Sequence, residues 1–138
     1  MKPILGILQK KILDTIPAGI SIASGASGTE VIHNARAAEF LRIQPWEDFA
    51  FKSGENQSVK LYHNGKELTP AGLPLNRSAW KGETVKGIEI DFIWDDGVRK
   101  TAVWNANPLF DENGLIIGAV AIFEEITALK QAEEALQV

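Results

Sequence analysis

The chain has 138 residues, 45% of them hydrophobic and 23% charged, which is typical of one globular domain rather than of a disordered segment. Fourteen Lys and Arg against eighteen Asp and Glu give a net charge of −4, which argues against a phosphate-binding surface for nucleic acid. The lack of Cys excludes disulfides, thiolate metal sites, cysteine nucleophiles and photochemistry through a cysteinyl adduct.

No apolar run reaches the roughly 18 residues that cross a bilayer. The apolar stretch 2–8 is short and is soon followed by Lys10 and Lys11, unlike a signal peptide. The sequence therefore predicts a cytoplasmic location, with any membrane anchor of the full-length protein lying outside this stretch.

Residues 1–16 should form an amphipathic N-terminal helix that ends at Pro17. Its apolar residues recur at helical spacing: Ile4, Leu5, Leu8, Ile12 and Leu13. Two short strands around Ile20–Ile22 and Val31–Ile32 should then flank a Gly- and Ser-rich loop, and Asn34 is a suitable N-cap for a helix over 35–42.

Residues 43–69 carry weaker signals. Pro45-Trp46 and the stretch 53–56 indicate loops with a short helical turn between them, and 59–62 indicate a small strand before an Asn64-Gly65 turn. A helix should follow over 74–83, with Pro74 in its first turn and Gly82 just beyond its last.

The last third of the chain predicts three antiparallel strands joined by tight turns. Apolar and polar residues alternate over 87–94, 98–108 and 115–126, and the turns between them are rich in Asp, Asn and Gly. Thr127 can cap a final helix. Two strands, short helices and then three strands predict an α+β fold with a five-stranded antiparallel sheet and helices on one face.

This order of elements, with its turn residues, resembles a PAS domain over residues 12 to 136. The match is carried by Ile16–Ile20, Asn34–Ala38, Leu73–Glu83, Asp96-Gly97, Asn107–Asp111, Gly114–Gly118 and Glu125-Ile126-Thr127. The resemblance implies an N-terminal helix over 1–16, a PAS core over 17–127 and, over 128–138, the start of a helical linker to an output domain outside this sequence.

The family usually ends its last strand with Asp-Ile-Thr or Asp-Val-Thr, whereas this chain has Glu125-Ile126-Thr127. The carboxylate is retained one methylene further from the backbone. These three residues are the expected site of signal transmission into the final helix.

The resemblance also bears on cofactors. In the flavin-binding light sensors of the family, three polar side chains of the last three strands face the flavin, and here Phe92, Ala102 and Phe123 occupy those positions. The helix that carries an axial His in haem sensors has none, and neither His33 nor His63 has a second ligand at a suitable spacing. A structural role is therefore preferred for both His, flavin and haem are disfavoured, no metal site is expected, and the cofactor is unknown.

Alternation places Ile88, Ile90, Phe92, Ala102, Trp104, Ala106, Ala119, Ala121 and Phe123 on the helix-covered face of the sheet. Small Ala residues beside large aromatic ones could leave a cavity for an apolar or aromatic small molecule, or could belong to a closed core. The candidate lining residues are Phe40, Trp46, Trp80, Phe92, Ala102, Trp104 and Phe123.

The other face of the sheet carries Val103, Val120 and Ile122 among charged residues, a pattern that indicates a partner surface. The N-terminal helix should lie across it, and two chains could form a homodimer through Leu5, Leu8, Ile12, Val103, Val120 and Ile122. Alternatively, the helix covers its own sheet and the domain is monomeric.

No nucleophile, base and orienting group occur at a recognisable spacing, so no catalytic residues are assigned. Arg77 and Glu83 are read as a structural pair, and Asp95, Asp96, Asp111 and Glu112 belong to hairpin turns. The first hypothesis is a non-enzymatic sensory domain of a bacterial histidine kinase, diguanylate cyclase or transcriptional regulator. The second is a constitutive dimerisation module with a filled core and no specific ligand.

Overall fold

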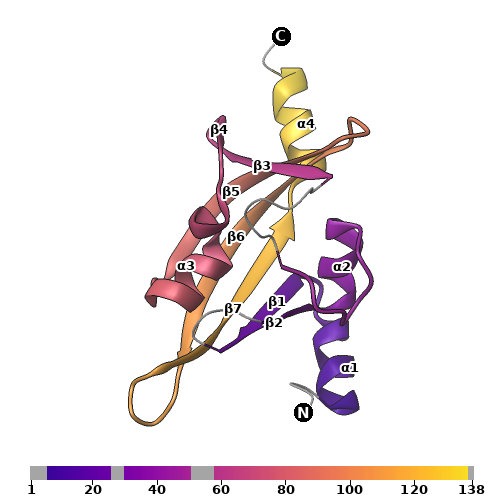
Figure 1. The fold of residues 1–138 in the computed structure, drawn as a ribbon. Coiled ribbons are helices and arrows are strands. Elements are labelled where there is room, and N and C mark those ends of the chain that lie inside the picture. The colour runs from indigo at the N-terminus through magenta and orange to yellow at the C-terminus, as the bar shows by residue number, and fades with distance from the viewer. Residues whose placement is uncertain (1–5, 26–29, 51–57, 137–138) are drawn as a thin grey trace.

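The computed structural model describes residues 6–25, 30–50 and 58–136, which form one antiparallel sheet with helices packed against it (Figure 1). In chain order the elements are α1 Ile7–Thr15, β1 Gly19–Ser24, β2 Glu30–His33, α2 Ala35–Leu41, β3 Val59–His63, β4 Lys66–Glu67, the 3₁₀ turn η1 Pro70–Gly72, α3 Pro74–Lys81, β5 Val85–Trp94, β6 Arg99–Phe110, β7 Ile116–Glu125 and α4 Thr127–Leu136. The predicted α+β class is confirmed.

The sheet has seven strands rather than the predicted five, in the order β2-β1-β7-β6-β5-β3-β4. The two additional strands come from the weakly patterned stretch: β3, which confirms the small strand indicated over 59–62, pairs with the C-terminal end of β5, and β4 pairs with β3 across the Asn64-Gly65 turn. The helical turn predicted after Pro45 is not formed in the described residues up to Ala50, and the loop predicted over 53–56 lies outside them.

The three long strands β5, β6 and β7 confirm the predicted meander. Trp104 of β6 lies opposite Phe123 of β7, and Ala106 lies opposite Ala121. Asp111 Oδ1 accepts hydrogen bonds from the backbone N–H groups of Asn113 and Leu115 at the β6–β7 turn, which is the backbone role expected of an Asp there.

Side chains of one sheet face form the core. Helix α3 contacts β6, β7 and β1, and α2 contacts β1. Of the nine residues predicted on the helix-covered face, eight are buried and Ile88 is partly buried. Five aromatic rings dominate this core: Phe40, Phe92, Trp94, Trp104 and Phe123.

Local chemistry fixes the helix ends as the sequence predicted. Asn34 Oδ1 accepts a hydrogen bond from Ala37 N at 2.9 Å, the bond expected of an N-cap, and also accepts one from Ile20 N. At the end of α3, Gly82 has a φ of 70°, a left-handed conformation that glycine adopts without a steric penalty.

The N-terminal helix α1 buries none of its residues. Its carboxyl end is held by Asn34, which donates a hydrogen bond to Leu13 O, and by Asp14, which accepts one from Ala35 N. No helix among the described residues is long and apolar enough to cross a membrane.

Candidate functional site

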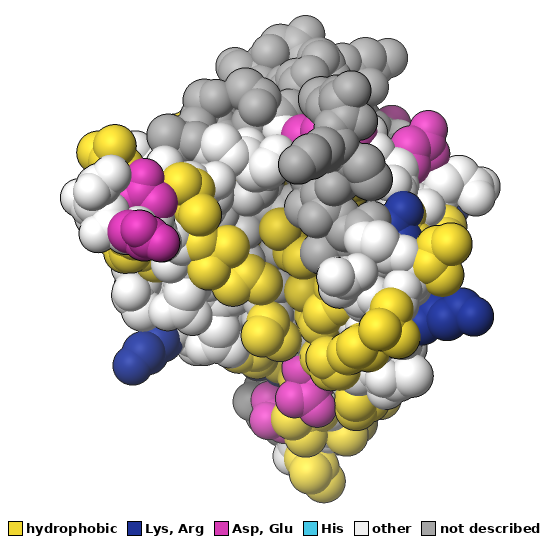
Figure 2. Space-filling view, turned by 90° about the horizontal axis from the view of Figure 1, so that it is seen from below, with side chains coloured by type: hydrophobic (Ala, Val, Ile, Leu, Met, Phe, Trp, Pro, Cys, Tyr) yellow, Lys and Arg dark blue, Asp and Glu magenta, His cyan; other side chains and the backbone are white. Residues whose placement is uncertain are grey.

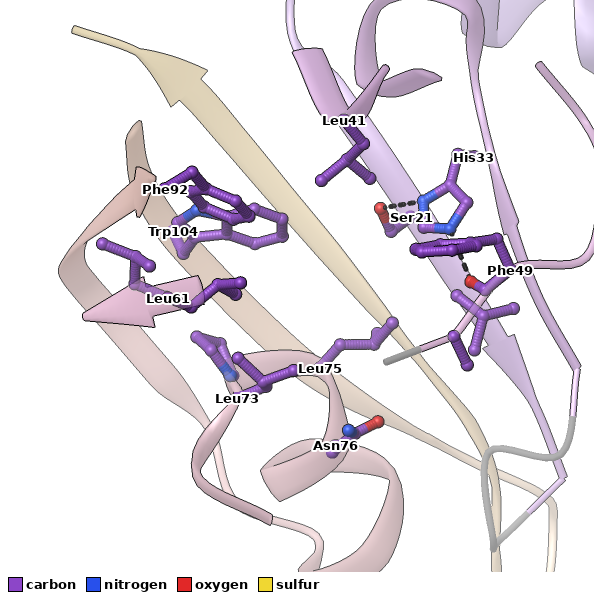
Figure 3. A pocket seen from close by; sticks show the side chains of 14 residues that line it. Ser21, His33, Leu41, Phe49, Leu61, Leu73, Leu75, Asn76, Phe92 and Trp104 are labelled. Carbon is purple, nitrogen blue, oxygen red and sulfur yellow. Dashed lines mark hydrogen bonds between the residues drawn. The ribbon is translucent and has the colours of Figure 1, made fainter. Parts of the chain in front are cut away.

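A cavity of about 40 Å³ lies on the inner face of the sheet (Figure 3). Ser21 and His33 lie on one side of it, Phe92 and Trp104 on the other, and the start of α3 closes it below. The lining residues that the structure describes are Ser21, Val31, His33, Leu41, Phe49, Ala50, Leu61, Leu73, Pro74, Leu75, Asn76, Ile90, Phe92 and Trp104. A water molecule occupies ~30 Å³ in the liquid and a cavity that binds benzene is ~150 Å³, so this conformation has room for about one water.

Among these described residues, His33 is the only charged or titratable side chain, and it is buried. Its Nε2 lies 2.8 Å from Phe49 O and its Nδ1 lies 2.7 Å from Ser21 Oγ. Because a carbonyl oxygen only accepts, Nε2 carries the proton, and Nδ1 of the neutral ring accepts from the Ser21 hydroxyl. Burial lowers the pKa of His33 below its ordinary value of 6.5, while the Phe49 carbonyl and Asp48 oppose that shift.

Two further polar side chains reach the lining. Asn76 Nδ2 donates to Pro70 O at 2.9 Å. The buried Trp104 Nε1 has no hydrogen-bond partner among the residues that the structure describes. An unpaired buried donor costs about 1–3 kcal/mol, so a water or a ligand acceptor at this nitrogen would stabilise the domain.

The start of α4 is anchored to β6 by hydrogen bonds to one buried residue, Thr101. Its N–H donates to Thr127 Oγ1 at 3.0 Å, and its carbonyl accepts from Ile126 N at 2.7 Å. Its hydroxyl donates to Asp91 Oδ1 of β5 at 2.7 Å. The Thr127 hydroxyl donates to Glu125 Oε2 at 2.6 Å, so the longer Glu side chain still reaches the end of the strand.

The outer face of the sheet remains partly uncovered. Val103 and Val120 are partly buried and Ile122 is 46% exposed. In α1, Leu8 is 70% and Ile12 is 53% exposed. The expectation that α1 lies across this face is therefore wrong, since its hydrogen bonds run to Asn34, Ala35 and Trp46; Leu5 lies outside the described residues.

Hydrophobic side chains spread over the face that is seen from below in Figure 1 (Figure 2). The end of the β6–β7 hairpin and α1 both lie at this end of the molecule. Their exposed hydrophobic residues are Ile7, Leu8, Ile12, Ile16, Leu109, Phe110, Leu115 and Ile117.

Several solved structures share this architecture. The PAS domain of a protein from Colwellia psychrerythraea aligns with a TM-score of 0.53 at 15% identity, covering 89% of this chain and 99% of that chain. A sensory box histidine kinase/response regulator from Burkholderia thailandensis E264 gives a TM-score of 0.55 at 12% identity, covering 94% of this chain and 92% of that chain. A light-oxygen-voltage domain studied with a flavin analogue gives a TM-score of 0.55 at 14% identity, covering 91% of this chain and 93% of that chain.

The chain has the PAS fold. No protein-family model and no curated protein matches the sequence. At these identities the similarity establishes the fold of this chain and leaves its activity to be argued from its own residues.

The residues predicted to line a PAS pocket fall into three groups. Phe92 and Trp104 line the cavity. Phe40, Ala102 and Phe123 are buried but do not belong to this lining, and Trp104 stacks on Phe123 with ring centroids 4.0 Å apart. Trp46 and Trp80 are not in the lining: the Trp46 indole N–H donates to Asp14 of α1, and Trp80 is 42% exposed on α3.

The inner surface does not fit a flavin or a haem iron. Phe92, Ala102 and Phe123 are buried on the inner face and offer no polar atom to a flavin ring. Both ring nitrogens of His33 are engaged, and His63 Nδ1 lies 2.8 Å from Glu89 O. Within residues 6–25, 30–50 and 58–136, no group of three or more His, Asp or Glu could hold a metal ion.

The charged residues singled out in the sequence lie beside the end of α3 and in the hairpin turns. Arg77 Nε lies 2.7 Å from Glu83 Oε2 beside the end of α3. Asp96 lies in the β5–β6 turn, where it pairs with Arg42 at 2.9 Å and accepts from Val98 N. The guanidinium of Arg42 lowers the pKa of the Asp96 carboxyl.

Sequence reasoning missed the Ser21 and α3 side of the cavity. Ser21 and Ala23 face inward while Ile20 and Ile22 face outward, because Ser21 pairs with Ala121 and Ile20 pairs with Ile122. The small residues Ser21 and Ala23 alternate along β1 as Ala119 and Ala121 do along β7, and this shared pattern could have indicated the register. Nothing in the sequence indicated that His33 would meet Ser21.

Proposed function

We propose that this PAS domain is a non-enzymatic signalling module that passes a change at its inner cavity through α4 to an output domain of the same polypeptide. One observation carries the proposal: β6 supplies both a wall of the cavity, through Trp104, and the anchor of α4, through Thr101. A displacement of the cavity wall would therefore reach the exit helix along a single strand.

Neighbouring residues on opposite faces support this route. Phe92 lines the cavity, and the preceding residue, Asp91, accepts the Thr101 hydroxyl on the other face. Lys130 of α4 lies 3.4 Å from Glu89 of the same strand. A ligand that moved Phe92 or Trp104 would shift the relative positions of Asp91 and Thr101 and hence the first turn of α4.

The output we propose is a histidine kinase, a diguanylate cyclase or a transcriptional regulator in the bacterial cytoplasm. A sensory box histidine kinase/response regulator is among the proteins with this fold. Glu125, Ile126 and Thr127 are the proposed transmission residues, because they join the last residue of β7 to the first residue of α4.

The proposed ligand is a small, uncharged molecule, since the described part of the lining is mainly apolar and its one titratable group, His33, has a lowered pKa. At about 40 Å³ the cavity would have to widen before it could hold anything as large as an aromatic ring. The small volume also supports the second function, a constitutive dimerisation module with a filled core. In that case the exposed residues of α1 and of the outer sheet face would pair with those of a second chain.

Native mass spectrometry of the protein as purified tests these proposals, because it reports the oligomeric state and any retained small molecule together. A retained molecule that is lost in Leu61→Phe, which adds bulk to the cavity wall, supports a ligand sensor. A dimer without any adduct, whose melting temperature no small-molecule library shifts, supports the dimerisation module. A monomer that retains nothing and shows no shift contradicts both.

A further inference from the structure

A second cleft lies at the surface between α2, the start of β1 and the end of β7 (Figure 1). Its volume is about 150 Å³, larger than that of the inner cavity, and the described linings of the two have no residue in common. The buried rings of Phe40 and Phe123 form an apolar side of this cleft, with their centroids 5.1 Å apart. A cavity of ~150 Å³ holds benzene, so the cleft has room for a ligand of about six non-hydrogen atoms.

Four charged side chains border the cleft, two of each sign. Arg36 and Glu39 lie about one turn apart on α2, Lys100 comes from β6, and Glu125 comes from the end of β7. Glu124 also borders the cleft, but alternation along β7 directs its side chain to the outer face of the sheet. None of the four forms an ion pair with another residue that the structure describes. Charges of both signs are therefore available to a ligand in the cleft.

Lys100 is held where its ammonium group can contact an anion. The ammonium donates to Phe40 O at 2.9 Å and to Glu39 O at 3.4 Å, and it lies 5.1 Å from the centre of the Trp94 ring. An ammonium group has three N–H donors, so one remains for an oxygen of the ligand. Arg36, exposed on α2, supplies the second cation.

Glu125 has one carboxylate oxygen left for a cationic group. Its Oε2 accepts the Thr127 hydroxyl at 2.6 Å, and no described residue donates to its Oε1. Glu39, exposed on α2, supplies the second carboxylate. A ligand in this cleft would therefore contact the side chain that is hydrogen-bonded to the first residue of α4.

We propose that this cleft is a second ligand site, which binds a small zwitterion such as a free α-amino acid with a short side chain. The ligand carboxylate contacts Arg36 and Lys100. Its ammonium group contacts Glu39 and Glu125, and its side chain contacts the aromatic side of the cleft. An anion alone would leave the two carboxylates without a partner, and a cation alone would leave the two cations without one. The site goes beyond the proposed function, because it lies apart from the inner cavity and requires no ligand there.

NMR titration of the nitrogen-15-labelled protein at about pH 7, where all four side chains are charged, tests this with three matched probes. The probes are L-alanine, propionate, which lacks the ammonium group, and ethylamine, which lacks the carboxylate. We expect L-alanine to shift the amide signals of Gly19, Phe40 and Phe123, which border the cleft. Propionate and ethylamine should bind at least about tenfold more weakly, because each forms only one of the two sets of charged contacts.

Arg36→Gln removes one cation from an exposed position of α2 and should bind L-alanine at least about tenfold more weakly than the wild type. Glu39→Gln, which removes one carboxylate, should have the same effect, so the test does not depend on a single variant. Lys86→Gln is the matched control. It removes a positive charge from an exposed position of β5 that does not border the cleft, and it should bind L-alanine like the wild type.

The absence of shifts at Gly19, Phe40 and Phe123 with L-alanine at up to about 10 mM would overturn the proposal. Shifts confined to residues of the inner cavity, such as Ser21 and Ile90, would also overturn it. Propionate or ethylamine binding as tightly as L-alanine would indicate a site for one charge only and would refute a zwitterion site. Unchanged affinity in both cleft variants, or equal weakening in the control variant, would contradict the assigned contacts.

Discussion

At the scale of single residues, Gly19 allows β1 to approach the aromatic core. Gly19 pairs with Phe123 across the β1–β7 ladder, and a Cβ at this position would overlap the Phe123 ring. Gly19→Ala should lower the free energy of unfolding by about 1–3 kcal/mol, because the ring must move within a packed core. Urea unfolding monitored by circular dichroism measures this change.

Gly72→Ala is the matched control. A Cβ at Gly72 would lie 3.5 Å from Leu68 Cδ2, an ordinary van der Waals contact. Its effect on the free energy of unfolding should stay within about 0.5 kcal/mol. If both variants lost the same free energy of unfolding, the packing of the Phe123 ring would not require a glycine at position 19.

Residues with a local backbone role could be predicted from the sequence. Asn34 caps α2, Gly82 ends α3, and Asp111 closes its turn, because each depends only on neighbours within a few positions. His33 could not be predicted in this way. Its partners are Ser21 and Phe49, and meeting them depends on the register of β1 and on the path of residues 46–50.

At the scale of elements, the first turn of α4 depends on Thr127. Thr127→Val keeps the shape of the side chain but leaves the buried Thr101 N–H without its acceptor, at a cost of about 1–3 kcal/mol. We expect amides of 128–136 to exchange faster in this variant while those of β6 and β7 stay protected, as measured by hydrogen–deuterium exchange. Thr127→Ser, which retains the hydroxyl, should behave like the wild type.

Faster exchange in Thr127→Ser as well, or unchanged exchange in Thr127→Val, would contradict the role of the hydroxyl. The sequence predicted this junction through the family pattern at Glu125-Ile126-Thr127. It did not predict the docking of α1, because an amphipathic stripe shows which helix face is apolar but does not identify what that face contacts.

At the scale of the whole molecule, the long strands were easier to predict than the edges of the sheet. Strands β5, β6 and β7 alternate over ten or more residues and are separated by Asp- and Gly-rich turns. The sequence indicated a small strand over 59–62, which β3 confirms, but it did not indicate that β3 joins the sheet beside β5 or that the two residues of β4 pair with β3, because that pairing is a long-range outcome. The five-strand prediction failed there.

The proposed homodimer leads to a prediction for the outer face. Ile122→Glu would bury a charge against the second chain, so we expect the dimer dissociation constant to rise at least about tenfold. Analytical ultracentrifugation measures this constant. Leu115→Glu, at the more exposed end of the β6–β7 hairpin, is the control and should leave the constant unchanged. Equal weakening by both variants would place the interface elsewhere.

Hydrogen–deuterium exchange of α4 in a cavity variant tests the central claim, that the cavity communicates with the exit helix. Leu61→Phe adds bulk to the cavity wall, and Leu115→Phe makes the same substitution on the exposed hairpin. The account predicts that exchange in 127–136 changes at least about threefold in Leu61→Phe and does not change in Leu115→Phe. Altered exchange in β5 and β6 of Leu61→Phe with α4 unchanged would contradict it.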